Sequence, residues 1–403
     1  VERSRARQLA DSLAGRAPGQ PRTEAHARAV VSPLDPVSLQ RELPGTVVLV
    51  YYVSREDSLL MWAVARDESH FLERRLPATE LRRLVEAHEA ALESRAPLVL
   101  VQEQAARLYD ELVRPLEPVL RPHPALIMIP DAALQAVAFA GLWDRERGRY
   151  LVEDHLVGVA PSGTVFVRAS IEAGAAPRGP APAVLAVGNP RLDREVAAGL
   201  PNLRGAEAEA EEIARLYARG EVLTGATATK SAFLERAGES EVVHFGGHTV
   251  SGDAPWATRL LFAPDPERGD TGALYVHDLH GKDLRRTRVV VLAACRTATG
   301  PGSGVEGALS FARPFLAAGV PSVVGSLWDI DDAASRRFFV AFHRALLAEG
   351  EPLLALRHTQ LALCRDHDPV LSHPASWAGF VSMGGLDPRQ LGRATTTDQS
   401  GSL

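Results

Sequence analysis

Hydrophobic and polar positions follow two different patterns along the chain. Between residues 45 and 76, three apolar stretches are separated by short polar segments at residues 54–57 and 66–68. Short apolar runs divided in this way are typical of an antiparallel meander. The pattern then predicts two helices, one buried strand and a strand pair, at residues 77–94, 101–121, 125–131 and 150–162.

Beyond a Gly-, Ala- and Pro-rich stretch at residues 173–182, which we interpret as a linker, apolar runs alternate with helical periodicity. The predicted strands are residues 183–190, 241–247, 288–295, 321–328 and 377–383. The predicted helices are residues 203–219, 229–237, 307–318, 331–349 and 352–365. Such alternation predicts an α/β fold, a mostly parallel sheet with helices on both faces.

The two ends of the chain have a different character from the middle. Residues 2–14 have a weak helical pattern that stops at a Gly/Pro-rich stretch, whereas the last fifteen residues are polar and are predicted to be disordered. We therefore divide the chain into an N-terminal helix and linker, a first half with the meander, a linker, a second half and a tail. Their bounds are residues 1–33, 34–172, 173–182, 183–388 and 389–403.

Composition narrows the classes of function. The 403 residues carry a formal net charge of −6 without a dense basic run, so electrostatics gives no reason to expect nucleic acid. No apolar run approaches the roughly 20 residues of a membrane span. Two cysteines cannot form a disulfide framework, which favours a reducing compartment. We expect a cytoplasmic protein without a membrane span or a nucleic-acid contact of its own.

Two predicted strands end in residues with catalytic chemistry. Cys295 follows the apolar run "VVVLAA", and His248 follows "EVVHFGG". The carboxyl ends of neighbouring parallel strands meet at one edge of a sheet, where open α/β folds bind ligands. There an imidazole can take the proton of a thiol, and nearby backbone N–H groups can hold a tetrahedral oxyanion. The pattern predicts acyl transfer, most simply the hydrolysis of peptide bonds.

The same residues allow two other interpretations, a zinc site and a dinucleotide-binding loop. His244, His248 and Cys295 could ligate zinc, but the H-x-x-x-H spacing faces one way only on a helix, and this stretch follows a strand. "GSGVEG" at residues 302–307 satisfies a dinucleotide fingerprint, yet Cys295 occupies the strand exit that the first Gly needs. We expect no metal and no cofactor. His244 is predicted to hydrogen-bond within the sheet, and Cys364 to be a core residue.

The same stretches resemble a known family. "VVHFGGHTV", "VVVLAACRTATG" and "ALSFARPFLAAGVPSVVGSLWDIDDAAS" look like the CHAT family of caspase-like cysteine peptidases, relatives of caspases, separase and gingipain that are often fused behind TPR repeats. "LPGTVVLVYYV" and "IPDAALQAVAFAGLWD" resemble its opening strands, so the likeness covers residues 45–385. The resemblance implies a caspase-like fold with a non-catalytic first half. It also implies a dyad of His248 and Cys295, with the backbone N–H groups of Thr249 and Cys295 as the oxyanion hole.

The family context implies a cysteine endopeptidase that cleaves a dedicated protein substrate under control of a TPR-type sensor module, in prokaryotic defence or regulated cell death. Thr249 stands where the family usually has Gly, which leaves a catalytically dead scaffold or binding module as the alternative. The stretch "SLWDIDD" has two interpretations. It forms the N-cap of the next helix, or it forms an acidic wall of the substrate pocket that favours Arg or Lys. The residues concerned are Trp328, Asp329, Asp331 and Asp332.

Overall fold

The computed structural model describes residues 2, 32–176, 179, 181–193, 199–250, 258–293 and 312–391. Several features singled out in the sequence lie outside these ranges: Cys295, the glycine-rich stretch at 302–307, nearly all of the predicted N-terminal helix, and the tail from residue 392.

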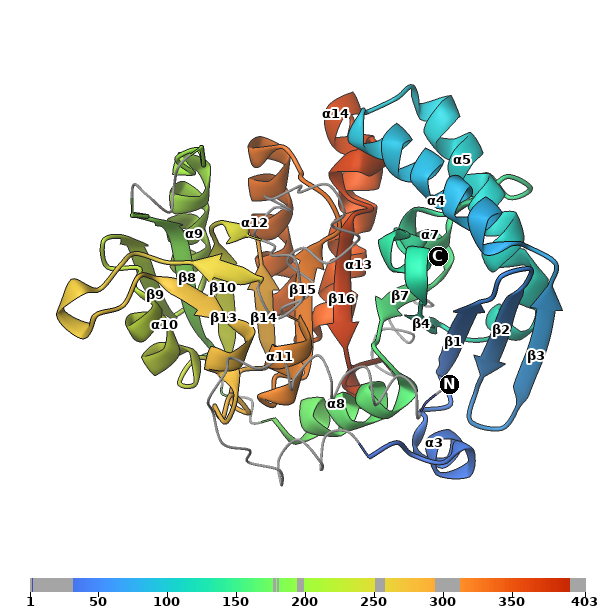
Figure 1. The fold of residues 1–403 in the computed structure, drawn as a ribbon, viewed down its shortest axis with the longest axis horizontal. Coiled ribbons are helices and arrows are strands. Elements are labelled where there is room, and N and C mark those ends of the chain that lie inside the picture. The colour runs from blue at the N-terminus through green and yellow to red at the C-terminus, as the bar shows by residue number, and fades with distance from the viewer. Residues whose placement is uncertain are drawn as a thin grey trace, which may run out of the picture.

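The described residues form one sheet of eleven strands that runs through the whole molecule (Figure 1). Its order is β3-β2-β1-β4-β7-β16-β15-β14-β10-β8-β9. The strands of the first half are β1 (Val47–Ser54), β2 (Leu59–Val64), β3 (Ser69–Arg74), β4 (Ala125–Ile129) and β7 (Leu156–Val159). Those of the second half are β8 (Ala183–Pro190), β9 (Arg219–Gly225), β10 (Val242–Gly246), β14 (Val289–Leu292), β15 (Ser322–Ser326) and β16 (Phe380–Gly384).

Strand directions divide the sheet into two groups. The pairing of β1 with β2 and of β2 with β3 is antiparallel, which confirms the predicted meander. Strands β1, β4, β7 and β16 are parallel to one another, as are β9, β8, β10, β14 and β15. The two groups meet at the antiparallel pair β15–β16. The carboxyl ends of their strands therefore lie at opposite edges of the sheet.

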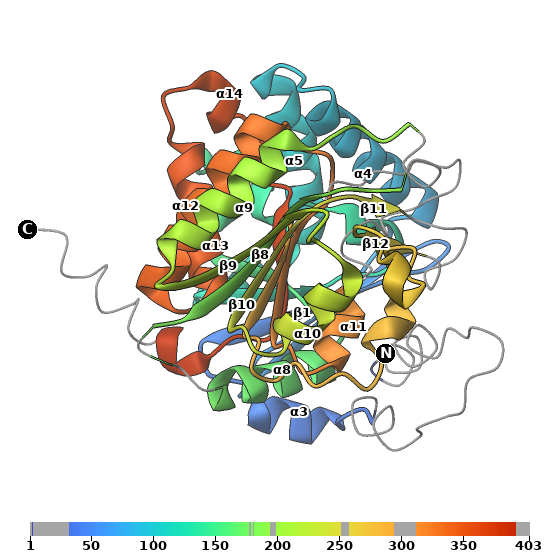
Figure 2. The same cartoon turned by 90° about the vertical axis from the view of Figure 1, so that its left-hand side faces the viewer.

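Helices cover both faces, as the alternation predicted (Figures 1 and 2). In the first half they are α3 (Pro36–Glu42), α4 (Ala78–Glu93), α5 (Leu98–Leu112), α6 (Glu117–Leu120), α7 (Leu151–Asp154) and α8 (Gly163–Ala175). In the second half they are α9 (Arg204–Leu216), α10 (Lys230–Ala237), α11 (Ala312–Ala317), α12 (Asp332–Glu349), α13 (Pro352–Cys364) and α14 (Pro369–Ser372). Helices α9 and α12 lie on one face of the second half, and α10 and α11 lie on the other (Figure 2).

Alternation along β10 explains these two layers. Val242 belongs to the core cluster that includes Phe339 of α12, whereas Val243 and Phe245 belong to the cluster that includes Phe233 of α10. Successive side chains of a strand point to opposite faces. Val242 contributes to one core and Val243 and Phe245 to the other, so helices bury the strand on each side.

The predicted strand pair at residues 150–162 is wrong in part. The short strand β6 (Arg149–Tyr150) pairs with β5 (Trp143–Asp144), and helix α7 then separates it from β7. The Glu153 carboxylate accepts a hydrogen bond of 2.9 Å from the backbone N–H of Tyr150, which stabilises a helical start at this point. Strand β7 pairs instead with β4 and β16.

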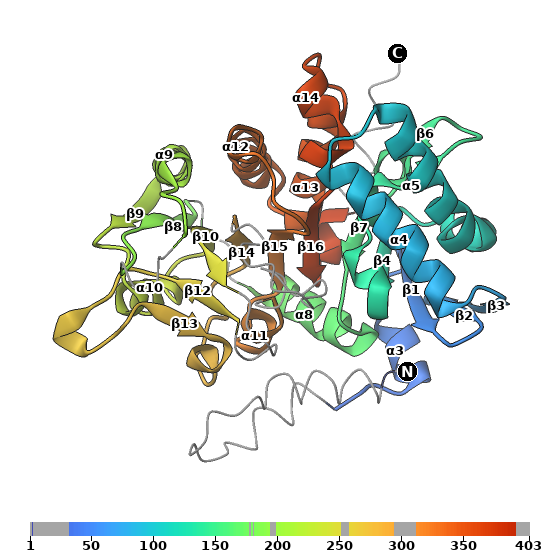
Figure 3. The ribbon, with the colours of Figure 1, turned by 45° about the horizontal axis from the view of Figure 1, so that its top comes forward.

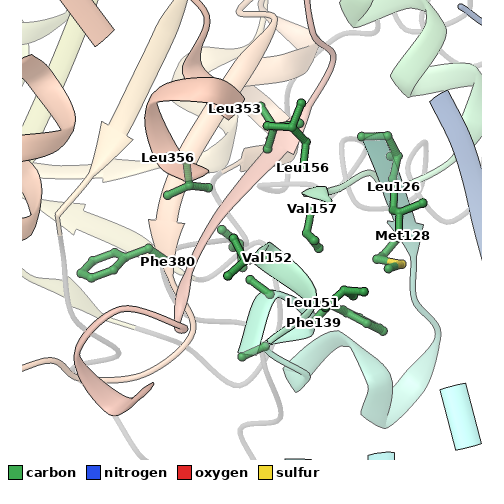
Figure 4. Packing of buried hydrophobic residues seen from close by; sticks show 14 of the residues in the cluster. Leu126, Met128, Phe139, Leu151, Val152, Leu156, Val157, Leu353, Leu356 and Phe380 are labelled. Atoms are coloured by element: carbon green, nitrogen blue, oxygen red, sulfur yellow. The ribbon is translucent and has the colours of Figure 1, made fainter. Parts of the chain in front are cut away.

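The two halves share a hydrophobic core where their strands meet. Figure 4 shows side chains of the first half packed beside those of α13 and β16, all of them buried; they include Leu126, Met128, Phe139, Leu156, Leu353, Leu356 and Phe380. The first half therefore stabilises the second by burying its apolar surface.

Residue 2 is held against the start of α8. The Glu2 carboxylate accepts hydrogen bonds from the Tyr51 hydroxyl at 2.7 Å and the Thr164 hydroxyl at 2.6 Å. It also accepts from the backbone N–H groups of Gly163 and Thr164, at 2.9 and 3.2 Å. A carboxylate at this end of a helix is favoured by the helix dipole, so Glu2 caps α8.

Close packing of α9 on β8 gives a first prediction. A Cβ at Gly188 would lie 2.5 Å from the Ala206 carbonyl oxygen and 2.7 Å from the Ala210 methyl group. We expect Gly188→Ala to lower the free energy of unfolding by about 2 kcal/mol, because α9 must move away from the strand. Gly45→Ala is the control, since a Cβ there meets nothing within 4 Å. Equal urea midpoints for the two variants would contradict this account.

Candidate active site

His248 lies at the edge of the sheet, two residues beyond β10. A three-stranded sheet holds its backbone, formed by β11 (Thr249–Val250), β12 (Arg259–Leu261) and β13 (Ala273–Tyr275). The N–H of Leu261 donates a 2.9 Å hydrogen bond to the His248 carbonyl. In Figure 3, β12 and β13 lie next to β8 and β10 of the large sheet. The histidine is therefore fixed at the edge where the sequence analysis expected it, and only 4% of it is exposed.

The hydrogen bonding of the imidazole defines its tautomer. Nε2 lies 2.8 Å from the carbonyl oxygen of Pro201, which can only accept, so Nε2 carries the proton. Nδ1 is buried and has no hydrogen-bond partner among the described residues. In the neutral ring that nitrogen holds a lone pair and can accept a proton. The ring is thus oriented as a base through Nδ1.

Burial controls the charge of this ring. Desolvation lowers the pKa of His248 below its usual value, and the hydrogen bond to Pro201 and the negative charge of Asp332 offset part of this effect. A lowered pKa keeps the imidazole neutral at neutral pH. His248 is therefore in the protonation state that a general base needs.

Pro201 is held in place by the end of β8. The side chain of Asn189 accepts a 3.0 Å hydrogen bond from the N–H of Leu203 and donates to Asn202 and Glu207, at 3.1 Å each. Asn189 has a φ of 49°, a left-handed conformation that Asn adopts more readily than most residues. This turn directs the segment that contains Pro201 toward His248. No sequence pattern marks Pro201, because it contributes only a backbone carbonyl.

The four residues of the "SLWDIDD" stretch have different environments. Asp331 caps α12, accepting from the N–H groups of Ala333 and Ala334 at 3.0 and 3.2 Å. Trp328 is buried, and its indole N–H donates to the Ala375 carbonyl at 3.0 Å. Asp329 and Asp332 are exposed. Of the four, Asp332 is the one whose charge acts on His248.

The strand that leads toward Cys295 adjoins the strand that leads to His248. β14 pairs with β10 in parallel, with Leu292 opposite Phe245. Ala293, two positions before Cys295, is the last described residue of this segment. Thr249 is buried in β11, in the extended conformation that β-branched residues favour.

His244 does not bond within the sheet, which corrects the expectation from sequence. Its Nε2 pairs with Glu209 of α9 and its Nδ1 with His343 of α12. Both nitrogens are thus occupied inside the core, so His244 cannot join His248 as a zinc ligand. In the described part of the chain no group of three His, Cys, Asp or Glu side chains is arranged to hold a metal ion, and no described helix is long and apolar enough to cross a membrane.

The charge of Asp332 gives a prediction about pH. We expect Asp332→Asn to lower the pKa of His248 further, because the charge that favours the imidazolium is removed. The acid limb of any activity that depends on this base would then move to lower pH. NMR titration of the His248 ring measures the pKa directly. Asp331→Asn is the control, since Asn also caps helices well, and an equal shift in both variants would contradict the assignment.

Comparisons with known proteins show which family and which proteins the chain resembles. A protein-family model described as the CHAT domain matches residues 102–385. Tetratricopeptide repeat protein 28 of Mus musculus is 27% identical over 330 residues, which are 69% of this chain and 13% of that protein. The Homo sapiens protein of the same name is 27% identical over 329 residues, with the same coverage. The chain therefore spans only a small part of these relatives.

Among solved structures, the Saccharomyces cerevisiae separase–securin complex has a similar fold. The TM-score is 0.55 at 10% sequence identity, and the match covers 90% of this chain and 31% of that one. At this identity the likeness is one of fold alone. The caspase-like α/β architecture expected from the sequence is thereby confirmed.

Proposed function

The chain belongs to the CHAT domain family, and on that premise we propose that it is a cysteine endopeptidase in which His248 activates the thiol of Cys295. The observation that carries the proposal is the state of the His248 ring. Its Nε2–H is bound to the Pro201 carbonyl, and its buried Nδ1 has no partner in the described part of the chain. A base so oriented needs a proton donor, and the strand beside β10 leads to Cys295.

The proposed reaction proceeds in two stages. Nδ1 of His248 accepts the thiol proton, and the Cys295 thiolate attacks the carbonyl carbon of the scissile peptide bond. The backbone N–H groups of Thr249 and Cys295 hold the oxyanion, and the imidazolium gives its proton to the departing amine. Water, deprotonated by His248, then hydrolyses the thioester and regenerates the thiol. Throughout, the Pro201 carbonyl stabilises the ring in one orientation.

The proposal extends to partners. The relatives that match are tetratricopeptide repeat proteins, of which this chain covers 13%. We propose that a repeat module of this type regulates the peptidase and that the substrate is a dedicated protein, in prokaryotic defence or regulated cell death. Asp329 and Asp332 are the proposed acidic side of the substrate pocket, together with the N-cap Asp331; all three are exposed, and Trp328 is buried.

A cleavage experiment tests the proposed activity. The wild-type chain, Cys295→Ala and Cys364→Ala are each incubated with a peptide library, and the cleaved bonds are identified by mass spectrometry. We expect the same bonds to be cut by wild type and by Cys364→Ala, and none by Cys295→Ala. Cleavage that survives in Cys295→Ala would refute the dyad. An acidic pocket predicts cleavage after Arg or Lys.

Alkylation provides a readout that needs no substrate. Burial raises the pKa of the Cys364 thiol to about 11, so little of it is thiolate at neutral pH. We expect iodoacetamide to modify Cys295 faster than Cys364, and His248→Ala to remove the difference. If Cys295 is alkylated no faster than Cys364 and no bond is cut, the alternative of an inactive scaffold is favoured.

A further inference from the structure

Four polar side chains form a continuous hydrogen-bonded chain inside the core next to β10. Glu209 of α9 lies 2.9 Å from Nε2 of His244, whose Nδ1 lies 3.2 Å from Nε2 of His343 on α12. Nδ1 of His343 lies 2.8 Å from the hydroxyl of Tyr217, the residue that ends α9. Both histidines are completely buried, and Glu209 and Tyr217 are almost so. We call this set the polar chain.

The donors and acceptors of the polar chain fit one direction. The Glu209 carboxylate accepts, so His244 donates from Nε2 and, when its ring is neutral, accepts at Nδ1. His343 must then donate from Nε2 and accept at Nδ1, where the Tyr217 hydroxyl donates. Each of the four groups is satisfied by its neighbours, which is the condition for a buried polar network to stabilise a single arrangement.

The surroundings of the polar chain favour a neutral ring at His343. His244 packs edge-on against Phe339, with ring centroids 5.4 Å apart. Burial and the neighbouring His244 lower the pKa of His343 well below its usual value, and burial raises the pKa of Tyr217. Among the groups described near Tyr217, Arg288 is the one cation that acts on it, and its charge offsets part of the rise in the Tyr217 pKa.

The three elements that the polar chain joins also build the candidate active site. Helix α9 begins three residues after Pro201, β10 ends two residues before His248, and α12 begins at Asp332. The starts of the two helices approach each other closely, since a Cβ at Gly205 would lie 3.4 Å from the Asp332 carboxylate. A shift of α9 against β10 would therefore change the distance between the Pro201 carbonyl and His248.

We propose that Glu209, His244, His343 and Tyr217 are positioning residues, which hold α9 and α12 on β10 so that the Pro201 carbonyl keeps the His248 proton on Nε2. This inference rests on the proposed function only for its effect on turnover. The part that concerns structure, the tautomer of His248, can be measured whether or not the protein cleaves peptides. The polar chain itself touches neither substrate nor the reacting atoms.

Two substitutions of Glu209 separate positioning from charge. The side-chain oxygen of Glu209→Gln can still accept from His244, whereas Glu209→Leu leaves that N–H without an acceptor. We expect ¹⁵N NMR of histidine-labelled protein to find His248 protonated on Nε2 in wild type and in Glu209→Gln, and a mixture of tautomers in Glu209→Leu. We also expect kcat to fall about 100-fold in Glu209→Leu with KM unchanged, as for a misplaced catalytic group.

A surface pair provides the matched control. Arg336 of α12 contacts Glu212 of α9 at 2.7 Å and so joins the same helices, but at the surface, where ion pairs contribute little. We expect Arg336→Ala to leave the tautomer and kcat unchanged, and Tyr217→Phe, which removes only the terminal hydroxyl, to have a smaller effect than Glu209→Leu.

Several results would overturn the proposal. One is a His248 ring that keeps its Nε2 proton in Glu209→Leu. A second is a double variant, Tyr217→Phe with Glu209→Leu, that keeps both this proton and its kcat. Another is a loss in Arg336→Ala equal to that in Glu209→Leu, which would mean that any contact between the helices suffices. If Glu209→Leu does not fold, Glu209→Gln decides. A mixture of His248 tautomers and a loss of kcat of about 100-fold in Glu209→Gln would then refute the proposed order of donors and acceptors in the polar chain. If wild type cuts no peptide, the proposed function fails, and the NMR result still decides this inference.

Discussion

His248→Ala should reduce kcat/KM about 100- to 10,000-fold against any peptide that the wild-type chain cleaves, the range typical of a lost general acid–base group. The ring is held by Pro201 through Nε2 and is neutral at neutral pH because burial lowers its pKa. Without it the thiol of Cys295 would stay mostly protonated, and the departing amine would lack a proton donor. Steady-state kinetics on one identified peptide measures the loss.

The pH profile of the wild-type enzyme gives the same assignment independently. The neutral imidazole is the active form, and burial lowers its pKa. Activity should therefore persist below pH 6.5, the pH at which an ordinary histidine is half protonated. His70→Ala is the control, since that residue lies on β3, near the far edge of the sheet, and is half exposed. An unchanged kcat/KM in His248→Ala, with the fold intact, would rule out this histidine as the base.

A second large effect is expected from His88, on the stability of the first half. This residue of α4 is 2% exposed, and neither ring nitrogen has a hydrogen-bond partner among the described residues. Burial lowers its pKa to about 4, against 6.5 in an unfolded chain. Between these values the unfolded state binds the proton and the folded state does not. Stability is therefore complete above pH 6.5 and decreases as the pH falls toward 4, by about 3 kcal/mol.

His88→Leu should remove both the cost of the unpartnered ring nitrogens and the loss of stability toward low pH. An apolar side chain has no nitrogen to leave without a partner, so we expect the free energy of unfolding to rise by about 1–2 kcal/mol at pH 7 and to depend less on pH below 6.5. His155→Leu is the comparison, because its Nδ1 lies 2.8 Å from the His123 carbonyl and that contact would be lost. Urea titrations at pH 7.5 and 5 distinguish the cases. A destabilised His88→Leu with unaltered pH dependence would show that the imidazole is not the source.

Fold prediction from sequence succeeded where burial was complete. The run that became β14 is buried at every position. The five predicted helices of the second half follow their predicted bounds within a few residues, apart from the part of 307–318 outside the described residues, whereas the short helix α14 was not predicted. Strand β9 was missed because it lies at the sheet edge, where its exposed start "RGE" gives no apolar signal. The three short strands β11, β12 and β13 contain two or three residues each, too few for a periodic pattern.

The candidate site was predictable only in its side-chain chemistry. His248 was identifiable because a histidine after a buried strand is itself a signal. Pro201 contributes a carbonyl that every residue has, so no sequence pattern marks it. The partners of His244 were also out of reach, because Glu209 and His343 lie 35 and 99 residues away and meet it only through the packing of α9 and α12 on the sheet.

The position of β16 has a consequence for the synthesis of the protein. This strand, near the end of the described chain, lies between β7 and β15 and joins the two halves of the sheet. Until it leaves the ribosome, β7 and β15 each present an open edge, which is prone to pair with other chains. At the usual rate of translation, the roughly 225 residues from β7 to the end of β16 take about 10 to 45 seconds. Nascent chains should therefore depend on chaperones during that interval, and stalling before residue 380 should leave two aggregation-prone half-sheets.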